Sequence, residues 1–313
     1  MPKSVVTGGA GFIGSTLVDR LVDDGHEVFV VDDLSSGSLG NLKDARQRGT
    51  VVVHQIDIVS PEIVDLVRTF QPENVFHLAA QIDVRHSVAD PVFDAKVNVL
   101  GTLNLLEAAR HGNAERFVFA SSGGAMFGDT FNIPTPEGQE RKPGSPYGVS
   151  KSVVEEYFRY YKENYELDFL SLGFSNVFGP RQDPYGEAGV VAIFVGDLIG
   201  HRTPTIYGDG SQTRDFVFVE DVADALVRAA RIGGSRYLNI GTGRETSIAK
   251  LYELIVEATG ADIAPIMAAP RRGEQLRSCL DARAAQEHLG WEAWTPLEEG
   301  IAATVDWFRR VGG

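Results

Sequence analysis

The sequence holds a single cysteine in 313 residues, and this scarcity excludes two kinds of site. Cys279 has no partner for an internal disulfide, and a zinc site of the thiolate type needs several cysteines. We therefore expect Cys279 to be a packed thiol. The seven histidines show no HxxxH or mixed ligand spacing, so we predict no metal site.

Long apolar runs, internal repeats and surplus positive charge are missing as well. No run approaches the ~20 apolar residues that span a bilayer, and the N-terminus shows no basic region, hydrophobic core and cleavage site. The 29 Lys and Arg residues face 43 Asp and Glu, and the net charge of −14 repels nucleic acid and anionic membranes. We expect a cytoplasmic protein that binds neither nucleic acid nor membrane.

What the sequence does contain is a regular alternation of strand-like and helix-like segments. Between the strand-like segments, apolar residues recur at three and four, as in amphipathic helices. This alternation predicts a doubly wound α/β domain with a parallel sheet covered on both faces. The predicted strands are SVV (4–6), VFVVD (28–32), VVVHQID (51–57), NVFHLAA (74–80), RFVFASS (116–122) and FLSLGFSNVFG (169–179).

The regular alternation of strand-like and helix-like segments ends after residue 180. PRQDPYGEAG is a loop rich in Pro and Gly, GDGSQTRDFVFVED predicts a turn and a strand, and YLNIGTGRETSI predicts a strand, a glycine turn and a helix start. We place the first domain at residues 1–175, rejoined by about 214–245. The second, smaller α/β domain lies mainly at 176–313.

The segment TGGAGFIG follows the first strand and opens a helix. Its Gly8, Gly11 and Gly14 let backbone amides approach a pyrophosphate at the positive end of that helix. Asp32 ends the next strand 18 residues after Gly14, close to the ~20 expected for the acid that binds the adenine ribose. Its charge lies where a 2′-phosphate would fall, which favours NAD over NADP. Two plainer interpretations stay open: glycines that only turn the chain, and a solvated turn formed by Asp32 and Asp33.

The segment SPYGVSK places Tyr147 and Lys151 on one face of a helix that its Ser-Pro pair begins. An ammonium four residues away, together with a positive nicotinamide ring, lowers the pKa of a phenol from about 10 toward neutrality, as a general base requires. From spacing alone, an amphipathic helix with a packed Tyr and a solvated Lys explains the pair as well. The cofactor loop and a strand ending in Ser121 and Ser122 favour proton transfer.

Together these blocks resemble a known family. TGGAGFIG, Asp32, ASSGGAMFG, YGVSK, NVFGPRQ, GDGSQTRDFV and NIGTG are similar in order and spacing to the extended short-chain dehydrogenase/reductases, most of all the bacterial UDP-glucose (UDP-galactose) 4-epimerases. The resemblance runs from residue 3 to about 310. It implies a Rossmann domain that retains NAD and a C-terminal domain that closes over a UDP-sugar. In that family C4′ of the sugar passes a hydride to NAD, the 4-keto intermediate rotates, and the hydride returns to the other face.

The resemblance also implies roles for single residues. Tyr147 would be the catalytic base, Lys151 its electrostatic partner, and Ser122 the hydroxyl that binds the substrate oxygen, with Ser121 in reserve. The implied cofactor site consists of Gly8, Gly11, Phe12, Ile13, Gly14, Asp32, Asp33, Ser36, Gly37, Asp57, Ile58, Leu78, Ala79, Ala80, Gln81, Asn98, Ser121, Tyr147, Lys151 and Phe174. The implied substrate site consists of Ser122, Gly123, Tyr147, Asn176, Gly189, Val190, Arg214, Arg271, Glu274 and Ser278.

Two of these assignments concern arginines. Arg214 and Arg271 match the family's diphosphate ligands, a role that suits the planar guanidinium fork. Without the family, each would be read as a surface charge.

The chain departs from the family at five positions. Gly123 stands where the catalytic Ser or Thr is usual, Gly173 where an Arg is common, and Phe127 and Phe174 replace Tyr. Ile82 falls where some epimerases place a Lys on the nicotinamide ribose. We expect this chain to bind NAD more weakly than the epimerases that have this Lys, but we still expect NAD to copurify with the protein.

Several functions stay open. A small Ser278 leaves room for an N-acetyl group, so we expect UDP-GlcNAc and UDP-GalNAc to be accepted. A UDP-glucuronate 4-epimerase, or another enzyme of this family that modifies sugar nucleotides, fits the same blocks. A 4,6-dehydratase is disfavoured because it needs an Asp-Glu pair where this chain has Gly-Gly-Ala. A non-catalytic NAD-binding regulator is opposed by Tyr147 and Lys151.

The helices near 91–110 and 147–165 carry more apolar residues than one core needs. The family pairs these helices in a four-helix dimer interface, so we expect a homodimer; packing within one monomer is the alternative. The residues concerned are Phe93, Val97, Leu100, Tyr157, Phe158 and Tyr161.

Overall fold

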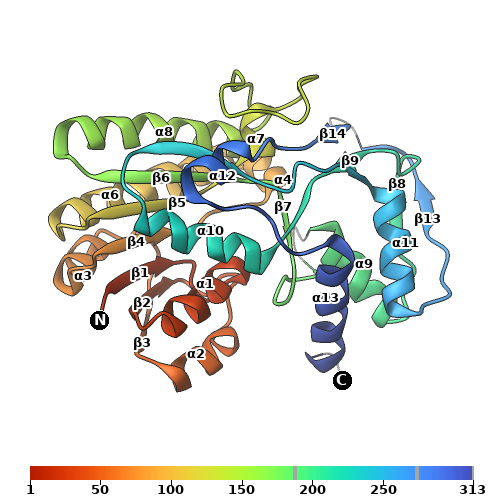
Figure 1. Cartoon of the computed structure of the whole chain (residues 1–313), viewed down its shortest axis with the longest axis horizontal. Coiled ribbons are helices and arrows are strands. Elements are labelled where there is room, and N and C mark those ends of the chain that lie inside the picture. Colours follow the sequence, from red (N-terminus) through yellow and green to blue (C-terminus); the bar gives the residue numbers. More distant parts are fainter. Residues whose placement is uncertain (186–188, 272–274, 312–313) are drawn as a thin grey trace.

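The computed structural model describes residues 1–185, 189–271 and 275–311 (Figure 1). Its strands are β1 (Lys3–Thr7), β2 (Glu27–Asp32), β3 (Val51–Gln55), β4 (Asn74–His77), β5 (Arg116–Ser122), β6 (Asp168–Phe174), β7 (Asn176–Phe178), β8 (Thr205–Tyr207), β9 (Thr213–Arg214), β10 (Phe216–Phe218), β11 (Arg236–Ile240), β12 (Thr246–Ser247), β13 (Ile266–Ala268) and β14 (Arg277–Ser278).

The α-helices are α1 (Phe12–Asp23), α2 (Lys43–Arg48), α3 (Glu62–Phe70), α4 (Val84–Ala89), α5 (Pro91–Ala95), α6 (Gly101–His111), α7 (Gly123–Phe127), α8 (Pro146–Tyr165), α9 (Val190–Ile199), α10 (Val219–Arg231), α11 (Ile248–Thr259), α12 (Arg283–Leu289) and α13 (Leu297–Val311). Two tighter or wider turns join them: the 3₁₀ helix η1 (Leu39–Leu42) and the π-helix η2 (Lys96–Leu100). No helix in the part of the chain described above is long and apolar enough to cross a membrane.

Seven parallel strands form the central sheet, in the order β3-β2-β1-β4-β5-β6-β11. The predicted doubly wound parallel fold is thereby confirmed. The direction of winding reverses between β1 and β4, and an open α/β sheet binds its ligands in the crevice at the carboxyl ends of such strands. The candidate site is therefore sought where β1, β4 and β5 end.

Both faces of this sheet are covered because successive side chains of each strand point to opposite sides. Along β1, Val5 packs with α3, α6 and α8, whereas Val6 packs with α1 and α10. Trp291 closes the second layer, and its indole nitrogen donates a hydrogen bond to the Asp221 carbonyl at 2.8 Å. Two dry layers hold the sheet rigid and so fix the positions of the strand ends.

A third core lies apart from the sheet. Helices α9, α11 and α13 pack around Phe178, Phe216 and Phe218, and Figure 1 shows these helices gathered on the right of the molecule. Three small sheets complete this part: β7 with β10, β12-β9-β14, and β8 with β13. The segment 219–240 returns to the central sheet as α10 and β11, while the exact domain boundaries remain a prediction.

The segment 169–179 does not form the single strand that the sequence predicted. Ser175 separates β6 from β7: its amide donates to the Ile240 carbonyl, whereas the next amide, that of Asn176, donates to the Asp215 carbonyl, each at 2.9 Å. The chain thus exchanges its pairing partner at this residue. Both halves carry apolar residues because β6 is buried in the central sheet and Phe178 of β7 is buried in the third core, so hydrophobicity alone gave no sign of the break.

Candidate active site

The glycine loop between β1 and α1 is a close backbone approach that side chains would block. Gly8 has φ +68, and a Cβ on it would lie 2.7 Å from the Ala79 amide. A Cβ on Gly14 would lie 2.0 Å from the Gly8 carbonyl oxygen. Gly11 precedes α1 with no side chain capping the helix, so the first amides of α1 are left for another acceptor. This cradle fits the pyrophosphate of a dinucleotide.

The two acids after β2 differ in their surroundings. Asp32 is 6% exposed, and its carboxylate accepts hydrogen bonds from the amides of Ala10 and Leu34, both at 2.9 Å. Asp33 is exposed, and its carboxylate accepts from the amide and hydroxyl of Ser35. The solvated turn therefore describes Asp33, while Asp32 fixes the glycine loop and remains the candidate for the ribose. Ser36 and Gly37 follow in the same loop.

The loop after β4 is held by the π-helix. The Asn98 side chain accepts a hydrogen bond from the Gln81 amide at 3.0 Å and donates one to the Gln81 carbonyl at 2.9 Å. This double contact fixes the loop that contains Leu78, Ala79 and Ala80. Because π-turns often mark functional sites, the position of Asn98 supports its predicted role beneath the cofactor.

Two predicted cofactor residues offer little side chain to a ligand. Ile58 is 4% exposed and packs against Gly101, and Phe174 is 7% exposed in the core around α1 and α10. The carboxylate of Asp57 accepts a hydrogen bond from the Val59 amide at 2.9 Å. The family motifs identified these positions near the ends of β3 and β6, but they did not show which side chains point into the core.

Tyr147 and Lys151 lie in the first turns of α8, which begins after Ser145 caps the Gly148 amide. Tyr147 is hydrogen-bonded to Ser122 at the end of β5. The Lys151 ammonium donates to the Ala120 carbonyl at 3.0 Å and lies 5.9 Å from the centroid of the Tyr147 ring. The sequence-predicted triad is thus brought together at the carboxyl end of the central sheet.

Burial shifts the pKa values of two members of this triad. Burial raises the pKa of Tyr147 to about 12, with the Ser122 hydrogen bond acting in the opposite direction. Burial also lowers the pKa of Lys151 to about 7. The same desolvation disfavours both charged groups, so the predicted tyrosinate depends on the positive nicotinamide ring as well as on Lys151.

The lowered pKa of Lys151 carries a prediction for stability. Between about pH 7 and 10.5 the unfolded chain holds a proton that the folded chain has released, so stability rises with pH there; below that window the full cost of a buried ammonium remains. We expect Lys151→Met to stabilise the nucleotide-free chain most at or below about pH 7, with the advantage shrinking toward pH 10. Urea unfolding at both ends of the window measures this. An equal gain at both pH values would contradict it.

The structure separates the two serine candidates. Ser122 contacts Tyr147, whereas the Ser121 hydroxyl points to the Met126 sulfur at 3.4 Å. A Cβ on Gly123 would lie 2.5 Å from a methyl carbon of Leu280, so the family's usual hydroxyl position is filled by this leucine. The working hydroxyl of this chain is therefore expected one residue earlier, at Ser122.

We expect Ser122→Ala to lower kcat by about 10- to 100-fold, since it removes the hydrogen-bond donor that favours the tyrosinate. Ser121→Ala is the matched control, because its hydroxyl faces Met126, and it should change kcat less than about 3-fold. Initial-rate measurements on both variants test the assignment. Equal losses in the two variants would contradict it.

Gly173, the second departure, has a steric reason as well. A Cβ there would lie 1.7 Å from the Tyr237 hydroxyl, so Tyr237 occupies the space that a longer side chain at 173 would need. The Tyr237 ring in turn packs edge-on against Phe127 and beneath the Arg141 guanidinium. Ile82 is 59% exposed and lies at the surface.

Of the predicted substrate residues outside the triad, Arg214 and Ser278 lie together on one small sheet. Arg214 on β9 is paired in register with Ser278 on β14, and the Arg271 guanidinium lies 3.9 Å from the centroid of the Tyr207 ring. A Cβ on Gly124 would lie 3.2 Å from the Ser278 hydroxyl, so these small residues face each other. Asn176 opens β7, Gly189 and Val190 open α9, and Glu274 lies outside the described residues.

Sequence reasoning missed Asp94. This carboxylate is fully buried and accepts hydrogen bonds from the Ser150 hydroxyl at 2.6 Å and from the Asn98 amide at 2.9 Å. Its negative charge raises the pKa values of both Tyr147 and Lys151. Nothing in its sequence context distinguishes Asp94 from a solvated helix residue, so only the packing of α5 on α8 could have identified it.

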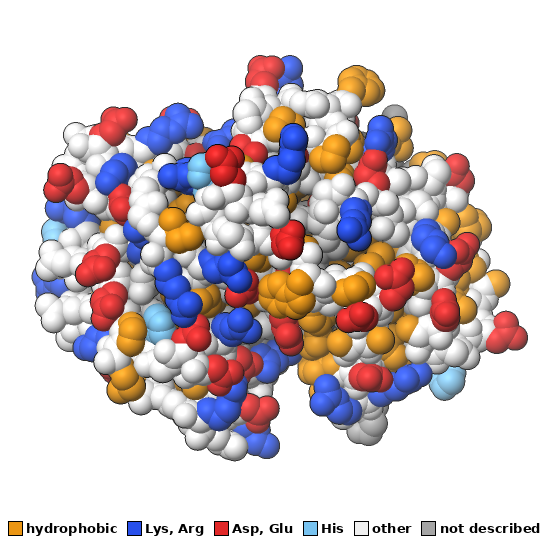
Figure 2. All heavy atoms as spheres, in the orientation of Figure 1, with side chains coloured by type: hydrophobic (Ala, Val, Ile, Leu, Met, Phe, Trp, Pro, Cys, Tyr) orange, Lys and Arg blue, Asp and Glu red, His pale blue; other side chains and the backbone are white. Residues whose placement is uncertain are grey.

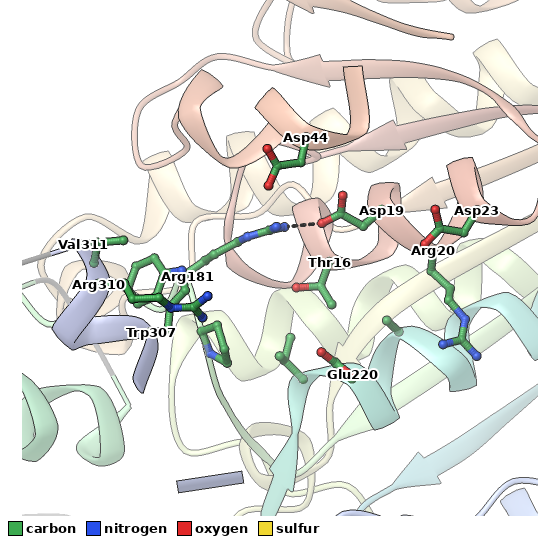
Figure 3. A pocket seen from close by; sticks show the side chains of 13 residues that line it. Thr16, Asp19, Arg20, Asp23, Asp44, Arg181, Glu220, Trp307, Arg310 and Val311 are labelled. Carbon is green, nitrogen blue, oxygen red and sulfur yellow. Dashed lines mark ion pairs between the residues drawn. The ribbon is translucent and has the colours of Figure 1, made fainter. Parts of the chain in front are cut away.

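The surface is hollowed elsewhere, between the two parts of the molecule (Figure 2). A cavity of about 490 Å³ lies there between α1, α10 and α13 (Figure 3). Arg181 crosses it to pair with Asp19 at 2.7 Å, and Trp307 forms part of its wall. None of the predicted site residues lines this cavity, so it is separate from the candidate active site.

Comparison with known proteins agrees with this geometry. A family model described as GDP-mannose 4,6 dehydratase matches residues 5–304. A UDP-glucose 4-epimerase from Mycolicibacterium smegmatis is 50% identical over 308 residues, which are 98% of each chain.

Two solved structures are similar over nearly the whole chain. UDP-glucose 4-epimerase from Thermotoga maritima, solved with UDP-glucose, has a TM-score of 0.95 at 43% identity and covers 99% of this chain and 100% of its own. UDP-glucose 4-epimerase from Thermus thermophilus, solved with NAD, has a TM-score of 0.91 at 41% identity and covers 98% of this chain and 99% of its own. The chain belongs to the extended short-chain dehydrogenase/reductases, the family of NAD-dependent epimerases and dehydratases.

Proposed function

We propose that this chain is an NAD-dependent 4-epimerase that interconverts UDP-glucose and UDP-galactose through a 4-keto intermediate. The observation that carries the proposal is that Tyr147, Lys151 and Ser122 meet where β5 ends, at the carboxyl edge of the parallel sheet. A dehydratase is disfavoured because Gly123, Gly124 and Ala125, which follow the hydroxyl, offer no acid to remove water.

The chain's own groups perform the proton transfer. Tyr147, acting as a tyrosinate, removes the proton from the 4-hydroxyl of the sugar and becomes a neutral phenol. Before this transfer, Ser122 donates a hydrogen bond that stabilises the negative charge on the phenolate oxygen. Bound NAD⁺ accepts the hydride from C4 and adds the positive charge that Tyr147 needs. Lys151, anchored on the Ala120 carbonyl, supports the tyrosinate once it forms.

Proton return follows from the same geometry. After the 4-keto sugar turns its other face to the nicotinamide, Tyr147 protonates the oxygen at C4 as the hydride comes back. The proton taken in the first half of the reaction stays on Tyr147 until the second half, so the reaction needs no outside acid or base.

The substrate is held from the side of the small sheets. Arg214 and Arg271 bind the diphosphate, and Asn176, at the exposed start of β7, contacts it as well. The small pair Gly124 and Ser278 leaves space beside the sugar, and we therefore include UDP-GlcNAc and UDP-GalNAc among the substrates.

One assay tests the proposed reaction. The purified chain is incubated separately with UDP-glucose, UDP-GlcNAc and UDP-glucuronate, and the products are separated by chromatography. The C4 epimer of UDP-glucose supports the proposal, whereas exclusive conversion of UDP-glucuronate assigns the alternative function. Rejection of UDP-GlcNAc by more than about 100-fold in kcat/KM removes the N-acetyl substrates, because steric exclusion acts at this scale.

The chain functions as a homodimer through α5, η2 and α8. These elements are neighbours and expose a row of apolar side chains that includes Val92, Leu100, Val149 and Val153. Phe158 and Tyr161, which the sequence assigned to this surface, pack into the monomer core instead, and Val97 packs partly against the same core. The exposed apolar residues on the outer face of α8, rather than Phe158 and Tyr161, therefore support the dimer proposal.

We expect Val153→Glu to convert a dimer into a monomer, since a charge at the centre of an apolar interface loses its hydration. Asn164→Glu, at an exposed position near the end of the same helix and outside this row, adds the same single negative charge and is the control for general acidity. Light scattering after gel filtration gives the mass of each. A wild-type chain of 34.0 kDa in solution would rule out the dimer.

A further inference from the structure

His77 is a buried titratable group that the proposed reaction does not use. It ends β4 at the switch point, is 1% exposed, and packs against the rings of Phe117 and Phe119. Both ring nitrogens nevertheless have partners: Nδ1 lies 2.8 Å from the Thr7 hydroxyl and Nε2 lies 2.9 Å from the Thr102 hydroxyl. The buried imidazole therefore connects Thr7 to Thr102 through two hydrogen bonds.

The directions of these hydrogen bonds follow from counting protons. The Thr102 hydroxyl donates its one proton to the Asn98 carbonyl at 2.6 Å, so it must accept from Nε2–H of His77. The Thr7 hydroxyl accepts from the Ala79 amide at 3.2 Å and donates its own proton to Nδ1. The chain of donors is complete only if His77 is neutral and carries its proton on Nε2.

The surroundings keep the ring in that state. Burial lowers the pKa of His77 well below its ordinary value, and the nearby Lys151 charge acts in the same direction. A second proton on the ring would place N–H of His77 against the hydroxyl proton of Thr7. His77 therefore stays neutral across the pH range in which the protein is folded and active.

This one ring joins three segments of the candidate cofactor site. Thr7 directly precedes Gly8 of the glycine loop, and Ala79 lies in the loop against which Gly8 packs. At the other end, the Asn98 carbonyl belongs to the π-helix whose side chain holds Gln81. The hydrogen-bonded path thus runs without a gap from the cradle for the pyrophosphate to the helix beneath the nicotinamide end.

We propose that His77 is a positioning residue, a permanently neutral Nε2-protonated imidazole that sets the spacing of the glycine loop, the loop after β4 and the π-helix, and so determines the affinity for NAD. The inference deepens the proposed function because it concerns the same cofactor site. It does not depend on which UDP-sugar is the substrate.

Nitrogen-15 NMR of histidine-labelled holoenzyme tests the protonation state directly. We expect His77 to show a protonated Nε2, an unprotonated Nδ1, and no titration between about pH 5.5 and 9, whereas exposed histidines titrate near 6.5. A proton on Nδ1, or a titration of His77 inside that range, would overturn the proposal.

NAD binding tests the positioning role. We expect His77→Leu to raise the Kd for NAD by about 10-fold or more, and the isosteric Thr7→Val and Thr102→Val variants to raise it by several-fold each. In the His77→Leu background, Thr7→Val should have a smaller effect than in the wild type, because only the contact of Thr7 with the Ala79 amide is then left to lose. Phe76→Leu, a buried change in the same strand, controls for destabilisation and should leave the Kd unchanged.

The outcomes separate this inference from the proposed function. If the wild-type chain binds NAD but epimerises no UDP-hexose, the proposed function is wrong. The role of His77 is then still tested by the Kd values of the variants for NAD. If His77→Leu binds NAD as tightly as the wild type, or if Phe76→Leu weakens binding as much, the positioning role is overturned.

Discussion

Replacing Tyr147 with phenylalanine should lower kcat by about 10²- to 10⁴-fold, the usual worth of a positioned acid–base group, and leave NAD bound. The change removes only the hydroxyl that contacts Ser122, while the ring keeps its place beside the Lys151 ammonium. Chromatography of UDP-galactose formed from UDP-glucose gives the rate, and the absorbance of the released nucleotide gives the NAD content.

Tyr165→Phe provides the matched control, because Tyr165 ends the same helix, is 42% exposed, and contributes its ring to a surface cluster. Its kcat should equal that of the wild type. A Tyr147→Phe enzyme with near-normal turnover would show that another group carries the proton, and the assignment of Tyr147 would have to be abandoned.

Gly14→Ala should abolish retention of NAD, with a rise in Kd of about 100-fold or more. The new methyl group would lie 2.0 Å from the Gly8 carbonyl oxygen, and neither the start of α1 nor the loop can yield without changing the cradle. Overpacking of this kind commonly costs ~3 kcal/mol, which is about 100-fold in binding if the strain falls on the bound state. The Kd is measured by titrating NAD into nucleotide-free protein.

Gly233→Ala is the control for glycine replacement as such. A Cβ on Gly233 meets no atom within 4 Å, so this variant should bind NAD like the wild type. Circular dichroism establishes that both variants are folded. If Gly14→Ala retained NAD in full, the cradle would not be the pyrophosphate site.

The sequence predicted the sheet because the information is local. Near-continuous apolar runs such as the one around Val5 and Val6 are what a strand buried on both faces requires, and the parallel order follows from the helices between them. The positions of Tyr147 and Lys151 at the start of α8 followed from the SPYGVSK motif, and the choice of Ser122 followed from the resemblance to the family. These predictions needed no knowledge of packing.

What the sequence could not predict depends on three-dimensional neighbours. Leu280 fills the space above Gly123, and Asp94 lies buried between α5 and α8, yet neither residue is part of a local pattern. The desolvation that raises the pKa of Tyr147 could not be predicted either, because a charge four residues away can be read from a sequence but the loss of water around the phenol cannot.

The order of strands in the central sheet has a consequence for synthesis of the protein. The outermost strand β11 (Arg236–Ile240) covers β6, which ends at Phe174, and a whole lobe of the chain begins between them. While the ribosome adds those intervening residues, the edge of β6 has no neighbour and can pair with other nascent chains. Synthesis that stalls before Ile240 would therefore release an aggregation-prone fragment, even though every residue of the catalytic triad had already been made.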